Sequence, residues 1–281
     1  PMWMVVSFSI VKDINVKEYR VTKRALITGA SKGIGESMAI ELAQRGWDLI
    51  LVARSQTLLE EHKERLEKKY GVSIEIFPCD LTVSVEREQL VSFVQTKKRL
   101  DALINNAGFG STGAFSTLSI ERELNQIDLN ISTVVALTHA LIPLLIPQKG
   151  YVLNIASTAG FQPGPYMAVY YATKSFVLHF SEALAVELKE VGVSVTAHCP
   201  GATESEFAKV AGNDKTVLFS KLNHVMPREV VAKHAIDSML ARKVVAIAGW
   251  RNWFLTLTVR FNPRWLVRRL AGWINQPGQW T

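Results

Sequence analysis

The stretch that decides the fold is a glycine-rich loop, Thr28-Gly29-Ala30-Ser31-Lys32-Gly33-Ile34-Gly35. It directly follows a short apolar run at residues 25–28 and opens an amphipathic stretch at residues 33–45. Glycines at this spacing permit a tight turn and a close approach of the backbone to a pyrophosphate, and the start of the following helix adds amide donors. A plain glycine-rich turn would use the same residues, so the position between strand and helix carries the prediction of a dinucleotide site.

Outward from this loop, apolar runs alternate with longer amphipathic stretches. The runs predict buried strands at residues 25–28, 49–53, 73–77, 102–105, 151–156, 194–198 and 244–248. The amphipathic stretches predict helices at residues 33–45, 58–69, 85–97, 119–146, 167–190 and 228–241. Because strands that alternate with helices are typical of βαβ units, we expect an α/β fold. It would be a Rossmann-type doubly wound parallel sheet of about seven strands with helices on both faces.

Length and composition fit one large domain, since the chain has 281 residues and is 48% hydrophobic. We expect an N-terminal arm at residues 1–22, a catalytic domain at 23–249 and a C-terminal extension at 250–281. The arm begins with an apolar run that is too short to span a bilayer and has no flanking signal-peptide features. Cys79 and Cys199 lie far apart in the sequence. Buried, reduced thiols are expected there, which fits a cytoplasmic location.

The net charge of +7 is concentrated near the C-terminus. No acidic residue follows Asp237, and seven basic residues do: Arg242, Lys243, Arg251, Arg260, Arg264, Arg268 and Arg269. Five tryptophans lie in the same extension. Apolar stretches at residues 250–261 and 265–274 flank Asn262-Pro263, and the second reads as an amphipathic basic helix with Leu266, Leu270, Trp273 and Ile274 on one face.

Such an end favours contact with an anionic surface such as membrane lipid, or a cover over the substrate entrance. The alternative is a tail that packs on its own domain or on a second subunit. Nucleic-acid binding has no support beyond the basic tail, so no nucleic-acid partner is predicted.

The end of the second predicted strand indicates which dinucleotide is bound. Dinucleotide folds that prefer NAD usually place an acid there to hold the ribose hydroxyls, but this chain has Ala53 followed by Arg54. Lys32 in the glycine loop adds a second cation. Two cations near the ribose favour a 2′-phosphate, and hence NADP(H). The alternative for Arg54 is a solvated residue at the start of a helix.

Further motifs follow in order along the chain. They are Cys79-Asp80-Leu81 after the third strand, Asn105-Asn106-Ala107-Gly108 after the fourth, Asn130 in the long helix, Ser157, Tyr170-Tyr171-Ala172-Thr173-Lys174, and Pro200-Gly201 after the sixth strand. Together with the glycine loop, residues 23–248 resemble the classical short-chain dehydrogenase/reductase family. The resemblance is to its NADP(H)-preferring carbonyl and ketoacyl reductases in particular.

The resemblance implies a catalytic set of Asn130, Ser157, Tyr170 and Lys174. It also implies the cofactor-binding residues, which are Thr28, Gly29, Ser31, Lys32, Gly33, Ile34, Gly35, Arg54, Asp80, Leu81, Asn106, Ala107, Gly108, Tyr170, Lys174, Pro200, Gly201, Thr203 and Ser205. Thr203 stands where the family often has an aliphatic residue, and Ser205 where it often has threonine. A homodimer or homotetramer is implied by analogy alone.

The chemistry of carbonyl reduction explains these residue types, because hydride must reach carbon and a proton must reach oxygen. Only Tyr170 stands four residues before Lys174, which puts both on one helix face, whereas Tyr171 is expected to pack elsewhere. The Lys174 ammonium and a cationic nicotinamide are expected to lower the Tyr170 pKa. The resemblance also implies that Lys174 binds the nicotinamide ribose.

Two further polar groups complete the expected machinery. Ser157 can donate a hydrogen bond to the substrate oxygen as negative charge develops there. Asn130 is expected to interrupt the helix hydrogen bonding and to hold a water that feeds protons toward Lys174.

The segment 206–226 lies where the family carries its variable substrate lid. It holds the apolar residues Phe207, Val210, Val217, Leu218, Phe219 and Leu222. With Phe161 and Tyr166 they predict an apolar pocket, and the expected substrate contacts are Ser157, Phe161, Tyr166, Tyr170 and Phe207.

The function expected from these features is NADPH-dependent reduction of a lipophilic ketone or 3-oxoacyl group. Two alternatives stay open: an alcohol or hydroxysteroid-type dehydrogenase that works oxidatively, and a non-catalytic, membrane-associated nucleotide-binding protein. The six scattered histidines form no metal-ligand pattern, and no metal is expected.

Overall fold

The computed structural model describes residues 22–212 and 225–276. Their centre is a seven-stranded sheet, all parallel, with the strand order β3-β2-β1-β4-β5-β6-β7. The strands are β1 (Arg24–Thr28), β2 (Asp48–Ala53), β3 (Ile74–Pro78), β4 (Ala102–Asn105), β5 (Tyr151–Ile155), β6 (Ser194–Cys199) and β7 (Val245–Ile247). The predicted Rossmann-type fold is confirmed, with strand ends that shift by one or two residues.

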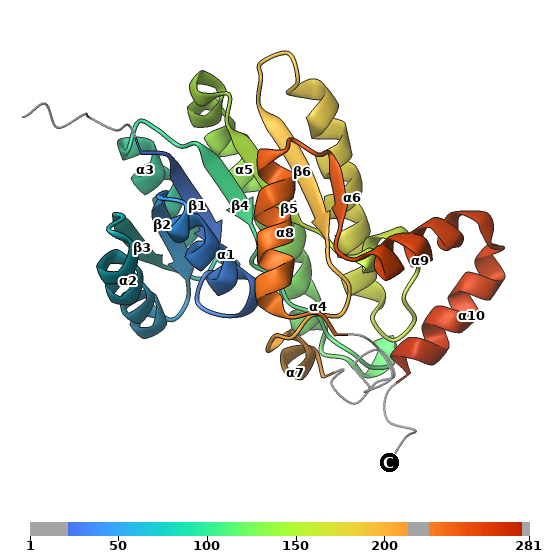
Figure 1. Ribbon diagram of the computed structural model, residues 1–281. Coiled ribbons are helices and arrows are strands. Elements are labelled where there is room, and N and C mark those ends of the chain that lie inside the picture. Colours follow the sequence, from blue (N-terminus) through green and yellow to red (C-terminus); the bar gives the residue numbers. More distant parts are fainter. Residues whose placement is uncertain (1–21, 213–224, 277–281) are drawn as a thin grey trace, which may run out of the picture.

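Helices cover both faces of the sheet (Figure 1). They are α1 (Gly33–Gln44), α2 (Gln56–Tyr70), α3 (Ser84–Thr96), α4 (Ile120–Ile127), α5 (Thr133–Leu145), α6 (Ala168–Glu187), α7 (Phe207–Ala211), α8 (Arg228–Leu240), α9 (Trp250–Phe261) and α10 (Arg264–Asn275). Residues 1–21 of the expected arm, the lid residues Val217, Leu218, Phe219 and Leu222, and Trp280 lie outside the described residues.

The pleat of the strands divides the core into two layers, because successive side chains point to opposite faces. Ala25 and Ile27 of β1 pack with Met38 and Leu42 of α1 and with residues of α2 and α8. Leu26, between them, packs on the other face with residues of α3 and α5. Burial on both faces explains why the strands read as continuous apolar runs rather than alternating ones.

The long helix predicted at residues 119–146 is interrupted in its middle. A π-helical turn, η2 (Asp128–Ser132), separates α4 from α5 and contains Asn130. The combined stretch Ile120–Gln148 is the one helix in the described ranges that is long and apolar enough to span a membrane. Its buried residues Leu137, Leu141 and Leu145 pack in the core layer under α3, so it is placed as a core helix of the domain.

The extension forms two helices, of which only the second was predicted as a helix, and they project beside α6 at one end of the molecule (Figure 1). The expected apolar face of α10 is wrong in detail. Val267 and Ala271 are buried, whereas Leu270 and Trp273 are about half exposed. The large side chains point outward because small ones allow α10 to approach the domain closely.

The sequence predicts buried, reduced cysteines and scattered histidines. Cys79 and Cys199 are free and buried, as predicted. The histidines are less scattered than the sequence indicates, because β6 and α8 bring His198 Nε2 within 3.0 Å of His234 Nδ1. Among the described residues, no group of three or more metal-ligating side chains comes together.

Candidate active site

A cavity of about 730 Å³ opens at the carboxyl ends of the strands. The loops after β1, β4, β5 and β6 converge on it, as parallel sheets require at a point where the strand order reverses. Its volume lies within the range of small-molecule and cofactor sites. The cavity brings together the predicted residues Gly29, Lys32, Gly33, Ile34, Asn106, Ala107, Gly108, Ser157, Tyr170, Lys174, Pro200, Gly201, Thr203, Ser205 and Phe207.

The glycine loop is held by the motif after β4. The Asn106 side-chain amide donates to the carbonyls of Thr28 and Gly29 at 2.9 and 3.1 Å. The Thr28 hydroxyl accepts from the backbone of Asn106 and Ala107. Gly29 has φ +65°, and a Cβ at Gly35 would meet the Gly29 carbonyl oxygen at 2.1 Å. The sequence therefore uses glycine where the turn and the helix start approach each other, which leaves a backbone cradle that fits a pyrophosphate.

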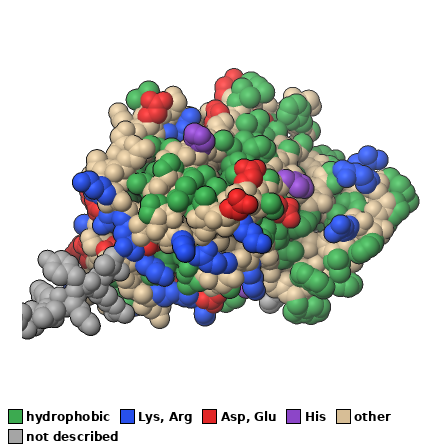
Figure 2. All heavy atoms as spheres, turned by 90° about the horizontal axis from the view of Figure 1, so that it is seen from above, with side chains coloured by type: hydrophobic (Ala, Val, Ile, Leu, Met, Phe, Trp, Pro, Cys, Tyr) green, Lys and Arg blue, Asp and Glu red, His purple; other side chains and the backbone are tan. Residues whose placement is uncertain are grey.

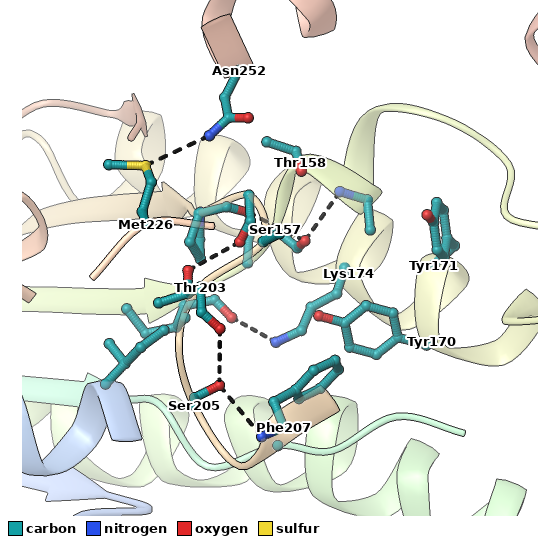
Figure 3. Close-up of a pocket in the computed structure, with 18 of the residues that line it drawn as sticks. Ser157, Thr158, Tyr170, Tyr171, Lys174, Thr203, Ser205, Phe207, Met226 and Asn252 are labelled. Atoms are coloured by element: carbon teal, nitrogen blue, oxygen red, sulfur yellow. Dashed lines mark hydrogen bonds between the residues drawn. The ribbon is translucent and has the colours of Figure 1, made fainter. Parts of the chain in front are cut away.

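Tyr170 and Lys174 lie one turn apart on α6, and both side chains point into the cavity (Figure 3). The Lys174 ammonium donates to the Ile155 carbonyl at 2.7 Å. Tyr171 points away from Lys174 in Figure 3, and its hydroxyl donates to Asn275 Oδ1 at 3.2 Å. The expected separation of the two tyrosines is therefore visible in the structure: one faces the polar groups of the cavity and the other contacts α10.

Ser157 is placed beside Tyr170 by the turn that follows β5. Its hydroxyl donates to the Pro200 carbonyl at 3.4 Å, and its oxygen accepts from the Ala159 backbone amide at 3.1 Å, which caps the short helix η4 (Thr158–Phe161). The capping role is compatible with a catalytic role, because the hydroxyl can keep the bond from Ala159 while its proton turns from Pro200 to a substrate oxygen.

Asn130 is almost fully buried in the π-helical turn. Its amide donates to the Phe109 carbonyl and to the Thr173 hydroxyl, both at 3.0 Å, and accepts from the Phe109 amide at 3.2 Å. A Cβ at Gly108 would lie 2.9 Å from Asn130 Oδ1. Asn130 therefore fixes the loop after β4 against α6, close behind Lys174. π-helical turns occur frequently at functional sites.

The pKa of Tyr170 moves in the direction opposite to the expected one. Burial raises it, and the hydrogen bond with Ser157 only partly offsets this. The Lys174 ammonium does not contribute, because it lies 5.8 Å from the centre of the Tyr170 ring and is directed at a carbonyl. Among the protein groups alone the expected lowering is not found, and the lowering with a cationic nicotinamide bound stays a prediction. Tyr170 is a neutral phenol at neutral pH, which is the form that can donate a proton.

Burial also lowers the pKa of Lys174 to about 8, against an opposing effect of Cys199. The ammonium is therefore present below pH 8 and is lost as the pH rises through that value. We expect kcat/KM for carbonyl reduction to fall above about pH 8, since this profile reports groups of the free enzyme. Steady-state rates across the pH range check this. A flat profile would contradict it, and residual activity of Lys174→Met should lack the inflection.

The two predicted cations stand in ion pairs outside the catalytic centre. Lys32 lies 2.9 Å from Glu206, and both side chains are about half exposed. Arg54 is largely exposed and lies 4.0 Å from Asp80. Burial raises the pKa of Asp80, but hydrogen bonds from Thr82 and the charge of Arg54 hold it below its ordinary value. The remaining predicted cofactor residues, Thr28, Ser31, Gly35, Arg54, Asp80 and Leu81, do not line this cavity.

The lid begins with a short hydrogen-bonded turn after β6. Ser205 donates to the Thr203 carbonyl and accepts from the Phe207 amide (Figure 3). The Phe207 ring packs 5.1 Å from that of Tyr170. Arg122 of α4 donates to the carbonyl of Val210 at 2.6 Å, which ties α7 to the domain. The spacing of the sequence gave no sign of this contact.

Two predicted substrate residues are placed elsewhere. Phe161 packs against a core cluster, and neither it nor Tyr166 lines the cavity. The corresponding walls come from residues that the sequence did not assign to the pocket. They include Gln162, Met167 and Met226, together with Trp250, Asn252, Leu255, Val259, Ala271 and Ile274 of the extension. The extension therefore covers the cavity, as one of the two sequence-based hypotheses proposed.

Comparisons with known proteins agree with this geometry. Residues 23–216 match the family model for short chain dehydrogenases. An NADP-dependent 3-hydroxy acid dehydrogenase of Schizosaccharomyces pombe is 33% identical over 236 residues, which are 80% of this chain and 90% of that protein. A very-long-chain 3-oxoacyl-CoA reductase of Danio rerio is 30% identical over 225 residues, covering 74% and 72%.

A solved structure extends the agreement to three dimensions. A short-chain dehydrogenase from Sphingobium yanoikuyae, in complex with NADPH, is 34% identical with a TM-score of 0.77 and covers 85% of this chain and 93% of its own. Its fold, the family match and the glycine cradle point to the same conclusion. The chain belongs to the short-chain dehydrogenase family and is an NADP-dependent oxidoreductase.

Proposed function

We propose that this enzyme reduces the carbonyl group of a lipophilic ketone or a fatty 3-oxoacyl compound. The observation that carries the proposal is that Ser157, Tyr170 and Lys174 meet in one cavity whose outer walls are apolar. Phe207 and Val210 from the lid, with Leu255, Val259 and Ile274 from the extension, supply those walls. An apolar wall favours a lipophilic substrate over a sugar.

Each of these cavity residues has a separate role in the proposed reaction. NADPH, when bound, supplies the hydride. Tyr170 donates the proton to the substrate oxygen, and the Ser157 hydroxyl hydrogen-bonds with that oxygen as negative charge builds on it. Lys174 would hold the nicotinamide ribose through its ammonium. Asn130 binds Thr173, the residue before Lys174, and lies against the loop at Gly108. These contacts help to position Lys174.

The two cations predicted near the cofactor ribose favour reduction over the oxidative alternative. Arg54 and Lys32 suit the 2′-phosphate of NADP(H), and a protonated Tyr170 can act as the proton donor. The third class, a non-catalytic nucleotide-binding protein, is disfavoured because Asn130, Ser157, Tyr170 and Lys174 all converge on one cavity or on the loop that borders it.

The names of the relatives are consistent with this substrate class. One is a very-long-chain 3-oxoacyl-CoA reductase and another acts on 3-hydroxy acids. We further propose that residues 23–249 form the catalytic domain and 250–281 an extension that contributes to the substrate pocket. A cytoplasmic location, in part at a membrane surface, and a homodimer or homotetramer complete the proposal. Exposed apolar residues on α4, such as Ile120 and Leu124, are available for subunit contact.

A substrate panel tests the function. Purified enzyme with NADPH is offered medium-chain and long-chain 3-oxoacyl thioesters, bulky aliphatic ketones and keto-sugars, and the loss of NADPH absorbance is followed. We expect kcat/KM to rise with the apolar size of the substrate, by about threefold for each added methylene that becomes buried. Preference for keto-sugars, or no dependence on chain length, would contradict the proposal.

Arg54 is proposed to hold the 2′-phosphate of the cofactor. We expect Arg54→Asp to shift the ratio of kcat/KM for NADPH over NADH by about tenfold to a hundredfold toward NADH, because it replaces a cation by an acid that accepts from ribose hydroxyls. Initial rates with the two cofactors give the ratio. Arg65→Asp, on the neighbouring helix α2, is the matched control, and an unchanged ratio in Arg54→Asp would refute the phosphate contact.

A further inference from the structure

The two helices of the extension present an outer face of large apolar side chains. Trp250 and Phe261 are 75% and 77% exposed. The other exposed members of this face are Trp253, Phe254, Leu255, Leu257, Trp265, Leu270 and Trp273. Figure 2 shows hydrophobic and basic side chains gathered at the end of the molecule where α9 and α10 lie. We call the exposed side chains of residues 250–273 the outer face. Monomeric soluble proteins rarely expose contiguous apolar surface on this scale.

The outer face belongs to helices that already pack on the domain with their other side. Its apolar residues are therefore not core residues that have lost their partners. On α9, Trp250, Trp253, Phe254, Leu257 and Phe261 follow the three- and four-residue spacing of one helix face. The opposite side of α9 contains the buried Thr256 and the cavity residue Val259. The side of α9 that faces the domain, its inner face, is therefore the side opposite these large residues, and on α10 the corresponding buried residues are Val267, Ala271 and Asn275.

Specific contacts attach the inner face to the domain. The buried Tyr171 hydroxyl donates to Asn275 Oδ1 at 3.2 Å, which joins α6 to α10. Asn252 donates to the Ala248 carbonyl at 2.7 Å, at the start of α9. A Cβ at Gly272 would lie 3.5 Å from the Pro165 ring. Because the inner face is already used, the apolar residues of the outer face need another environment.

The charge of this region identifies that environment. Arg251, Arg260, Arg264, Arg268 and Arg269 are all exposed, and no acidic residue follows Asp237 anywhere in the sequence. On α10, Arg269 lies on the same face as Trp265 and Trp273, and Arg268 flanks that face beside Trp265. Tryptophan with arginine, without acids, fits the boundary between lipid headgroups and acyl chains. We propose that the outer face of α9 and α10 docks on an anionic lipid bilayer.

The position of the cavity gives this docking a role in the proposed reaction. Trp250, Arg251 and Leu255 line the cavity and are also exposed, so its mouth opens beside the outer face. A docked enzyme would present this mouth to the membrane, and a lipophilic carbonyl compound would pass from the bilayer into the cavity without crossing water. This step rests on the proposed substrate class, whereas the docking itself does not.

Sedimentation with vesicles tests the docking. The full-length protein is mixed with vesicles of phosphatidylcholine alone, or of phosphatidylcholine with phosphatidylglycerol, and the bound fraction is measured. We expect binding to the anionic vesicles and at least tenfold weaker binding to the neutral ones, because each basic residue near the surface contributes to attraction. High salt should release the protein. Equal binding to both vesicles, or binding to neither, would overturn the proposal.

Two variants locate the surface. Trp253→Ser/Phe261→Ser/Trp265→Ser removes apolar anchors that do not line the cavity, and Arg264→Gln/Arg268→Gln removes charge. Each should lower vesicle affinity by about tenfold or more while the melting temperature and the rate with a water-soluble ketone stay unchanged. The matched controls, Val85→Ser/Phe115→Ser/Val186→Ser and Lys68→Gln/Lys189→Gln, change exposed residues elsewhere and should bind as the wild type does.

Analytical ultracentrifugation separates a lipid partner from a second copy of the chain. Loss of self-association in the triple variant, with vesicle binding unchanged, would assign the outer face to a subunit interface and overturn the proposal. The proposed substrate class is tested by a separate measurement. If no lipophilic carbonyl compound is reduced in detergent or in vesicles, the proposed reaction is wrong, but the sedimentation result for membrane docking still holds.

Discussion

Replacing Tyr170 with phenylalanine is expected to lower kcat for carbonyl reduction by about 10²- to 10⁴-fold, the usual contribution of a positioned proton donor. The change removes one oxygen atom from a partly buried ring that packs against Phe207. The shape of the cavity is retained, so the affinity for NADPH should stay within about twofold. Single-turnover rates with saturating NADPH, together with NADPH fluorescence titrations, measure the two effects separately.

Tyr171→Phe is the matched control because it removes the neighbouring hydroxyl on the same helix. It leaves the Asn275 oxygen without its donor, and we expect a loss of about 1–3 kcal/mol in unfolding free energy with little change in kcat. If Tyr170→Phe kept a tenth or more of the wild-type rate, another group would be the proton donor. If Tyr171→Phe were the inactive variant, the register of the catalytic pair would be wrong.

Ser157→Ala has the second largest expected effect. Its hydroxyl lines the cavity together with Tyr170 and is the proposed donor to the substrate oxygen, and loss of one such donor to a developing oxyanion costs about 10²- to 10³-fold in kcat. The same oxygen caps η4 by accepting from the Ala159 amide, so about 1 kcal/mol of stability should be lost as well. Rates and thermal melts of the same preparation record both effects.

Ser157→Thr distinguishes the two roles of this residue. Threonine keeps a hydroxyl for the cap and for the substrate oxygen, and we expect it to recover most of the rate lost in the alanine variant. Thr158→Ala, at the next position, should leave kcat nearly unchanged. A Ser157→Ala enzyme whose entire loss of rate follows its loss of stability would show that Ser157 is a capping residue and not a donor to substrate.

Much of the fold follows from local sequence features. Residues such as Leu26 and Ile50 are buried on one face of the sheet while their neighbours are buried on the other, so the strands appear as short apolar runs. The glycine loop and the asparagine motif after β4 could also be predicted to meet, because the carboxyl ends of parallel strands lie at the same edge of the sheet. Asn130 was expected to interrupt its helix, and the π-helical turn at that position confirms it.

The outer part of the site depends on contacts that the sequence does not encode locally. Phe161 and Tyr166 looked suitable for the pocket from their position, but the walls come from α9 and α10, which lie more than 80 residues further along the chain. The helical pattern of α10 was read from its largest residues, yet its buried stripe runs through the small Ala271 and beside Gly272. Two helices can approach each other closely only where the facing residues are small. Small residues are weakly hydrophobic, so the sequence pattern does not mark them as buried.

The electrostatics of the site were the least predictable feature. Spacing alone placed Lys174 one turn from Tyr170 and indicated a lowered tyrosine pKa. The folded chain turns the Lys174 ammonium to the Ile155 carbonyl and buries Tyr170, so desolvation raises the pKa instead. The pairing of Lys32 with Glu206 is likewise a long-range contact between the glycine loop and the lid. Both depend on distances that only the tertiary structure sets.

Transfer of a label from cofactor to product tests the central claim most directly. The enzyme is incubated with a long-chain 3-oxoacyl thioester and NADPH that carries deuterium at the transferred position, and the product is analysed by mass spectrometry. We expect one deuterium on the carbon that was the carbonyl carbon, formed by the wild type and nearly absent with Tyr170→Phe. Unlabelled product, or no alcohol from any lipophilic ketone, would contradict the account of a carbonyl reductase that uses Tyr170 as its proton donor.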